Sequence, residues 1–126
     1  MKRILKENRS AFTLVEIMIV VSIIGLLAVM VIPAIDKARK QSEGRRIIND
    51  ARQEDAAIDQ WALETGQIDG DKVNTTDAAT YLKEPWKTKD VLGHAYKIGK
   101  VGTQQVLIAV TTKRALANVG IDWGPY

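Results

Sequence analysis

The feature that most constrains this chain is an apolar run from Phe12 to Ile35. Its 24 residues are apolar, small or hydroxylic apart from Glu16. A helix that spans a bilayer needs about 20 apolar residues. A cleaved secretory signal has an apolar region of only about 7 to 15 residues, with a small-residue cleavage site after it. Because this run is longer and the basic stretch 37–40 follows it, we predict a membrane-spanning helix.

The net charge of the chain is concentrated at its start. The first eleven residues carry +3, from Lys2, Arg3, Lys6 and Arg9 against Glu7, and the other 115 residues carry 14 basic and 14 acidic side chains. Apart from this leader, the composition therefore gives no basis for nucleic-acid binding. Basic residues flank the apolar run on both sides, so the positive-inside rule does not decide its orientation.

Glu16 is the charged residue within the apolar run. A carboxylate at membrane depth is costly and usually has a partner or a wet site. Glu16 lies four residues after Phe12, which follows the small residue Ala11. A cut between Ala11 and Phe12 would create an amine that could pair with the Glu16 carboxylate, within one chain or between adjacent chains. The alternative is that Glu16 lies at the membrane edge and contacts headgroups.

A basic leader, a small residue, Phe-Thr-Leu-Val-Glu and a long apolar helix resemble the class III signal of type IV pilins and type II secretion pseudopilins. The resemblance implies a cytoplasmic leader of residues 1–11, removed by a prepilin peptidase between Ala11 and Phe12. It further implies methylation of the Phe12 amine and a role for Glu16 in assembly and register. The family usually has Gly where this chain has Ala11.

The same resemblance extends along residues 12–35. They would first span the inner membrane and then form the core of a helical filament made of copies of this chain. Gly25 and Pro33 fall where the family often carries a helix-loosening Gly and Pro. Pro33 lacks a backbone N–H and clashes with the preceding turn, so we expect a helix bend there. For Gly25 the alternative is an ordinary membrane-helix glycine.

The resemblance also implies the partners and the location of the mature protein. The partners are a prepilin peptidase, an assembly ATPase, an inner-membrane platform protein, minor pilins or pseudopilins, and membrane lipid before assembly. No nucleic acid is expected. The filament would be a surface pilus or a periplasmic secretion pseudopilus, and the residues leave both open. The alternative from another class is an uncleaved single-span anchor that displays a small binding head.

Residues 36–126 are predicted to form a small pilin-like head with an α+β fold, a long helix packed on a small antiparallel sheet. Apolar residues recur at helical spacing up to a Gly cap at Thr65–Gly66. The predicted buried stripe is Ile47, Ile48, Ala51, Ile58, Trp61 and Ala62. Four charged residues are predicted to lie off this stripe, namely Asp50, Arg52, Glu54 and Asp59.

The rest of the head is predicted to contain a short helix and two strands. Thr75 or Thr76 could cap a helix that ends at Leu82. Alternation predicts strands over 95–98 and 106–110, with either a third strand within 115–119 or a helical turn over 113–118. The segment EPWKTKDVLGHAYKIG is similar to the D-P-W-G-N-P-Y turn of major pseudopilins at Asp90, Gly93 and Tyr96. The tail from Gly120 is expected to pack irregularly.

Candidates for catalysis and metal binding are poor. The chain has no cysteine and a single histidine, His94, and its three serines, at positions 10, 22 and 42, precede or lie within the long helix. No hydrolase triad is expected, and we predict that the chain is not an enzyme. Asp69, Asp71 and Asn74 loosely resemble the start of a calcium loop, but Thr80 stands where a bidentate Glu is needed. We therefore expect no cofactor.

Overall fold

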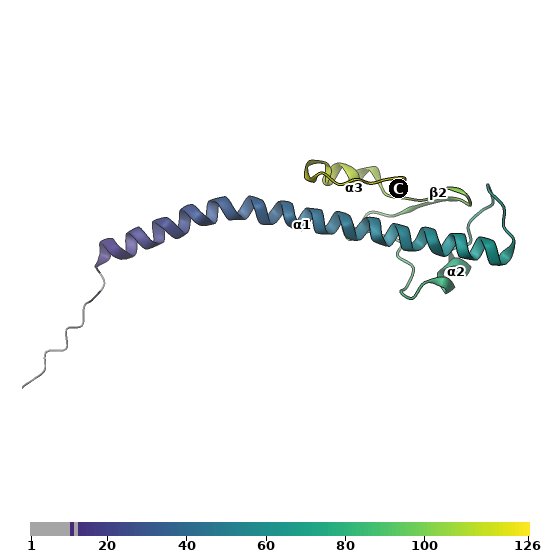
Figure 1. The fold of residues 1–126 in the computed structure, drawn as a ribbon, viewed down its shortest axis with the longest axis horizontal. Coiled ribbons are helices and arrows are strands. Elements are labelled where there is room, and N and C mark those ends of the chain that lie inside the picture. Colours follow the sequence, from purple (N-terminus) through teal and green to yellow (C-terminus); the bar gives the residue numbers. More distant parts are fainter. Residues whose placement is uncertain (1–10, 12) are drawn as a thin grey trace, which may run out of the picture. The chain divides into compact units, whose positions relative to one another are not determined.

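The computed structural model describes Ala11 and residues 13–126, and its ribbon is drawn in Figure 1. The chain divides into two units, Met1–Asp36 and Lys37–Tyr126. The helices are α1 (Leu14–Thr65), α2 (Thr75–Ala78) and α3 (Val110–Ala115), the 3-10 turns are η1 (Ala79–Tyr81) and η2 (Ala117–Val119), and the strands are β1 (Lys97–Lys100) and β2 (Thr103–Leu107). The long helix and small antiparallel sheet confirm the predicted α+β, pilin-like fold.

Helix α1 presents its predicted apolar stripe to the head. All six predicted residues are buried, with Ile47, Ala51 and Ile58 fully inaccessible. The helix ends at Thr65, and Gly66 adopts φ +71°, as the predicted left-handed cap requires. The Gln67 N–H then donates to the Ala62 carbonyl at 2.9 Å, which closes a Schellman motif.

The placement of two acidic residues on α1 was predicted wrongly. Asp50 and Glu54 are 6% and 2% exposed, and so lie within the buried face. Their carboxylates are held by Lys87, whose Nζ is 2.7 Å from Asp50 Oδ1 and whose backbone N–H donates to Glu54 Oε1 at 3.0 Å. The prediction placed these residues on the solvent side because an acidic side chain is costly to bury alone. Here Lys87, from a distant loop, supplies the partner that makes their burial possible.

Strands β1 and β2 form a two-stranded antiparallel hairpin with a short turn. Lys97 pairs with Leu107 and Lys100 with Thr103, and the register shifts between Ile98 and Lys100. The strands of the hairpin therefore extend into residues 99–105, which lie between the predicted strands 95–98 and 106–110. Alternation marks the apolar ends of the strands, but the polar Thr103, Gln104 and Gln105 continue β2 without an apolar signal.

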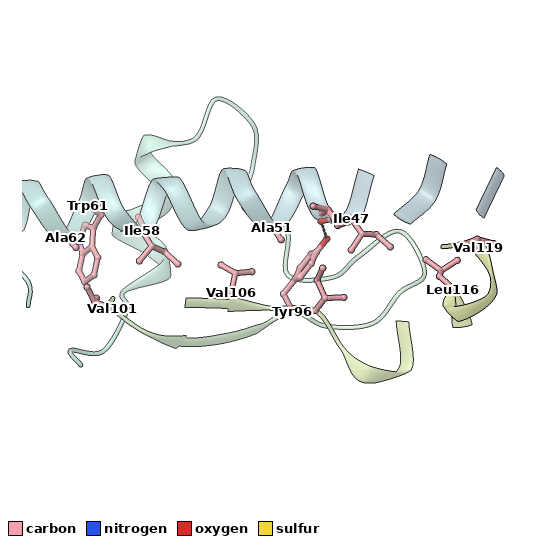
Figure 2. Packing of buried hydrophobic residues seen from close by; sticks show 13 residues of the cluster. Ile47, Ala51, Ile58, Trp61, Ala62, Tyr96, Val101, Val106, Leu116 and Val119 are labelled. Atoms are coloured by element: carbon pink, nitrogen blue, oxygen red, sulfur yellow. Dashed lines mark hydrogen bonds between the residues drawn. The ribbon is translucent and has the colours of Figure 1, made fainter. Parts of the chain in front are cut away.

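The head has one hydrophobic core among the described residues, between α1 and the hairpin. Figure 2 shows Ile47, Ala51 and Ile58 on α1 pointing toward Val106 and Tyr96, while Trp61 and Ala62 lie beside Val101. Leu116 and Val119, from α3–η2 and its surroundings, extend the core toward the start of the head helix. The Tyr96 hydroxyl reaches the Ile47 carbonyl at 3.4 Å.

The short helices differ from the prediction in two ways. Asn74, not Thr75 or Thr76, caps α2, because its side chain accepts the N–H groups of Thr76 and Asp77. The segment after β2 forms α3 and η2, so the helical alternative is confirmed and a third strand over 115–119 is wrong. Thr112, on α3, is fully buried.

A turn centred on Asp90 precedes the hairpin. The Asp90 Oδ1 atom accepts the backbone N–H groups of Leu92 and His94, both at 2.9 Å, and Gly93 adopts φ +85°. The Asp90 N–H donates to the His94 carbonyl at 2.8 Å. Thr112 donates its hydroxyl to the other carboxylate oxygen of Asp90. This buried carboxylate therefore shapes the turn and joins it to α3.

The tail after η2 packs irregularly, as predicted. Ile121 lies against Gly44 of α1, where an added Cβ would meet Ile121 Cδ1 at 2.0 Å. Lys113 donates to the backbone carbonyl of Tyr126, and the Tyr126 hydroxyl is 3.4 Å from Asp55 Oδ2. The last residues are thus bound to both α3 and α1.

Candidate assembly segment at the N-terminus

The first part of α1 presents its apolar side chains outward. Its large hydrophobic residues from Leu14 to Ile35 are between 49% and 81% exposed. Within the described residues α1 is the one helix long and apolar enough to cross a membrane, by length and composition, and its most apolar 18-residue window has a mean hydropathy of 2.9. Exposure of so much apolar surface to water is unfavourable. This segment therefore needs lipid or other protein around it.

Glu16 and Thr13 cap the start of α1 reciprocally. The Thr13 N–H donates to Glu16 Oε2 at 3.2 Å, and the Glu16 N–H donates to Thr13 Oγ1 at 3.3 Å. This is a capping box, which satisfies two of the free N–H groups at a helix start. The carboxylate also lies at the positive end of the helix dipole. We did not predict this contact from the sequence, although the Thr-x-x-Glu spacing of Thr13 and Glu16 is the pattern of a capping box.

The other predicted site residues lie at or within this segment. Ala11 is exposed and has no regular secondary structure. Phe12 and residues 1–10 are outside the described residues, so the predicted leader and amine cannot be placed. Gly25 and Pro33 are within α1, which continues through both. A Cβ on Gly25 would meet nothing within 4 Å, so packing within the chain does not require a glycine there.

Ser22 shows how a polar side chain is accommodated on this surface. Its hydroxyl donates to the Met18 carbonyl at 2.7 Å, one turn earlier. The hydroxyl is therefore satisfied within its own helix and needs neither water nor a partner chain. Between Leu14 and Ile35, Glu16 is the only charged residue in the sequence.

The residues considered for calcium have other roles in the head. Asp71 Oδ2 accepts the Ile68 N–H at 2.9 Å, and the Asn74 amide donates to Asp77 at 2.6 Å. The Asp69 carboxylate lies against Gly102 in the hairpin turn. Within the described residues no group of three or more His, Asp or Glu side chains could hold a metal ion.

His94 belongs to a structural hydrogen-bond network. Its Nδ1 is 2.8 Å from Thr112 Oγ1, and that hydroxyl gives its proton to Asp90. Because Thr112 has one proton to donate, its oxygen accepts the second bond from an Nδ1–H of His94. Thr112 is fully buried, so the hydroxyl in this His–Thr–Asp array is inaccessible to a substrate.

Comparison with known proteins supports the prediction of a prepilin-type signal at the N-terminus. Residues 6–32 match the family described as the prokaryotic N-terminal methylation motif. The chain is 27% identical over 62 residues to the type II secretion system core protein G of Klebsiella michiganensis, covering 49% of this chain and 44% of that protein. It is 29% identical over 62 residues to the core protein G of Aeromonas hydrophila, covering 49% and 43%.

These matches cover less than half of the length of either relative. No solved structure matches the chain significantly. The motif and the exposed apolar helix define a protein with a prepilin-type signal, a combination typical of an inner-membrane precursor. The chain thus carries a prepilin-type methylation motif and is a distant homologue of type II secretion pseudopilin G.

Proposed function

We propose that the chain is the precursor of a structural filament subunit, and that the filament is a pseudopilus of a type II secretion system. The observation that carries the proposal is an exposed apolar helix whose first part lies within an N-terminal methylation motif matched over residues 6–32. The relatives named above favour a secretion pseudopilus over a surface pilus. The expected partners are a prepilin peptidase, an assembly ATPase, an inner-membrane platform protein and minor pseudopilins.

Processing is proposed to divide the chain into a leader of residues 1–11 and a mature protein that begins at Phe12. The peptidase cuts after Ala11, and the new amine is methylated. Residues 12–35 then cross the inner membrane while residues 36–126 form the head outside the cytoplasm. During assembly the apolar segments leave the lipid and pack against copies of themselves, with Gly25 and Pro33 loosening the helix.

The Glu16 carboxylate is proposed to pair with a Phe12 amine in the filament. In the structure it accepts the Thr13 N–H, one peptide away from the amine that cleavage would create. Two unit charges about 4 Å apart attract by about 4 kcal/mol at an effective dielectric near 20. Desolvation offsets much of this attraction. The pair therefore acts on alignment, because a subunit shifted along the axis would bury an unpaired charge at a cost of several kcal/mol.

The test is the intact mass of the protein from membranes and from sheared filaments, after coexpression of the full chain with a prepilin peptidase. We expect a chain that starts at methylated Phe12. Ala11→Gly should keep or speed cleavage, and Ala11→Trp should block it. A chain that retains Met1 in the assembled material would contradict the proposal and support an uncleaved membrane anchor instead.

A second measurement distinguishes the two kinds of filament. The gene can be placed in a type II secretion strain that lacks its own major pseudopilin, with its own peptidase present. Restored secretion supports the pseudopilus. Long surface filaments without restored secretion support a pilus.

A further inference from the structure

A short stretch of loop, residues 83–87, lies against the acidic part of α1. None of its residues is fully buried, although Trp86 packs against the core. Within the described part of the chain, none of its backbone groups bonds to another backbone group. Its polar links to the other described residues of the head are the two bonds of Lys87, to Asp50 and to Glu54. A segment with so few buried contacts and backbone bonds opens at low cost.

Both ends of the 83–87 segment are anchored. Before it, the Tyr81 hydroxyl donates to Glu64 Oε2 at 2.6 Å. After it, the Thr88 carbonyl accepts the Tyr96 N–H at 3.1 Å. The segment can therefore move away from α1 while the chain on either side of it stays in place.

Glu54 lies under this segment in a site that disfavours its charged form. Its Oε1 atom accepts the Lys87 N–H, but no donor among the described residues reaches the buried Oε2 atom. The hollow beside it, between α1 and residues 82–87, has a volume of about 10 Å³. A single water needs about 10 to 15 Å³, so the closed structure has no room for the hydration that a carboxylate requires.

The groups around Glu54 carry more negative than positive charge. Lys87 Nζ lies 2.7 Å from Asp50 and 3.2 Å from Glu84, so this ammonium already serves two other carboxylates. Burial raises the pKa of Glu54 from 4.5 to about 7, and Asp50 adds to the rise while Lys87 opposes it. Glu54 therefore ionises as the pH rises through about 7. The charged and titratable groups near it are Asp50 on α1, Glu84 and Lys87 on the segment, Tyr96 beside the hairpin and, close to Tyr96, Arg46.

We propose that residues 83–87 form a proton-controlled flap, which lies closed against α1 while the Glu54 carboxyl is neutral and opens when that carboxyl loses its proton to water. Ionised Glu54 repels Asp50, and the single Lys87 ammonium does not offset both charges. Opening the flap lets water reach the two carboxylates. The opposing costs are the lost Lys87 contacts and the lost packing of Trp86, which hold the flap closed at lower pH.

Opening of the flap uncovers part of α1. Ala57 is 3% exposed and lines a hollow of about 340 Å³ together with residues 81–84. It does not belong to the core cluster between α1 and the hairpin, so movement of the flap exposes Ala57 without disturbing that core. The head thus presents a different surface of α1 above neutral pH. The inference concerns residues of the head alone and does not depend on the proposed function.

The rate of thiol labelling at Ala57→Cys measures the opening. The chain has no other cysteine, so the full-length variant in detergent micelles can be labelled with N-ethylmaleimide, with Glu54 kept or with Glu54→Gln added. At pH 8 we expect labelling to be several-fold faster in the chain that keeps Glu54, and at pH 5.5 we expect equal rates. A nearby carboxylate raises the pKa of a thiol and so slows its labelling, which is opposite to the expected effect. Equal rates at pH 8 would overturn the proposal.

Two controls separate a local flap from opening of the whole head. Val106→Cys lies at a 1% exposed position in the core and should be labelled far more slowly than Ala57→Cys at pH 8. Equal rates at these two positions would mean that the whole head opens and would overturn the proposal. Glu43→Gln, next to exposed Arg39, should keep the faster labelling of Ala57→Cys at pH 8. Loss of that effect in Glu43→Gln would assign it to general charge and overturn the role of Glu54.

Hydrogen exchange of the Lys87 amide tests the flap in chains without any added cysteine. This N–H is bonded to Glu54 Oε1 in the closed structure and is freed when the flap opens. At pH 8 its exchange should be several-fold faster in the wild type than in Glu54→Gln, whose amide oxygen keeps the acceptor and cannot ionise. Equal exchange of this amide in the two chains would overturn the proposal, whether or not Ala57→Cys folds.

Discussion

Lys87 Nζ lies 2.7 Å from Asp50 Oδ1, and this ion pair joins the loop before the hairpin to the buried face of α1. Glu84 Oε2 is 3.2 Å from the same ammonium, and Glu54 accepts the Lys87 backbone N–H. The Asp50 side chain is 6% exposed and that of Lys87 30% exposed. The head thus buries two carboxylates beside a single ammonium, and its stability depends on that ammonium.

We expect Lys87→Met to destabilise the head by about 2 kcal/mol, because Asp50 would remain buried without its basic partner. Partial exposure of Lys87 keeps the cost below that of a fully buried pair. Urea unfolding of residues 37–126 measures the effect, since the buried residues of the described chain begin at Gly44. Lys83→Met is the matched control in the same loop, where the lysine is exposed. Equal stability of the two variants would show that the Asp50 pair contributes nothing.

The Glu54 carboxyl should make the head less stable as pH rises. Burial raises the pKa of Glu54 from 4.5 to about 7, and Asp50 adds to the rise. Among the described residues no donor reaches the buried Oε2 atom, so nothing there stabilises the charged form. The folded state then binds more protons than the unfolded state between these values. Stability from this group is complete below about pH 4.5 and is lost as pH rises through about 7, by at most about 3 kcal/mol.

Glu54→Gln tests this dependence, because an amide keeps the acceptor for the Lys87 N–H and cannot ionise. We expect the variant to be more stable than the wild type at pH 8 and its stability to vary less between pH 5 and pH 8. Burial also raises the pKa of Asp55, so a smaller decline should persist. Glu43→Gln, next to exposed Arg39, is the control and should retain the wild-type slope. A steep decline in Glu54→Gln would assign the effect to another group.

Gly99 should be intolerant of any side chain. It lies where the hairpin register shifts, and an added Cβ would meet the Gln104 carbonyl oxygen at 2.3 Å. Because that atom belongs to the backbone of the paired strand, it cannot move without disturbing β2. We expect Gly99→Ala to cost about 1–3 kcal/mol in thermal or urea unfolding. Lys97→Ala, at an exposed position on β1, should stay close to wild type. A wild-type stability for Gly99→Ala would mean that the hairpin relaxes freely.

Calcium should leave the stability of the head unchanged. Asp71 Oδ2 accepts the backbone N–H of Ile68, and Asn74 Oδ1 accepts that of Thr76 at the start of α2, so both oxygens are already engaged. The melting temperature of residues 37–126 is expected to be the same in calcium and in chelator. A rise of many degrees in calcium would show that the loop around Asp69 reorganises to bind the ion.

The parts of the fold that follow from local pattern were predictable from the sequence. The stripe from Ile47 to Ala62 and the Gly66 cap follow from helical period and glycine conformation. The position of the hairpin did not, because the polar end of β2 is specified by pairing with β1 rather than by its own alternation. The burial of Asp50 and Glu54 depends on Lys87, more than thirty residues away, and no local signal indicates such a partner. The capping box at Thr13 is a local pattern that we could have recognised.

The capping role of Glu16 in its own helix can be separated by mutation from the role in assembly that we propose for its charge. Glu16→Gln can keep the hydrogen bond to the Thr13 N–H, since Gln also completes a capping box, but it has no charge to pair with a Phe12 amine. Thr13→Ala does the reverse, because it removes the hydroxyl and keeps the carboxylate. If Glu16 aligns subunits through its charge, Glu16→Gln should lose filaments as severely as Glu16→Val, and Thr13→Ala should retain them. Glu16→Asp should be intermediate, since its shorter side chain reaches the amine poorly. Membrane insertion and cleavage should be unchanged in all four variants.

Electron microscopy of sheared filaments measures assembly, and an immunoblot of the membrane fraction measures insertion and cleavage. Normal filaments from Glu16→Gln would assign the residue to helix capping alone and remove its role in register.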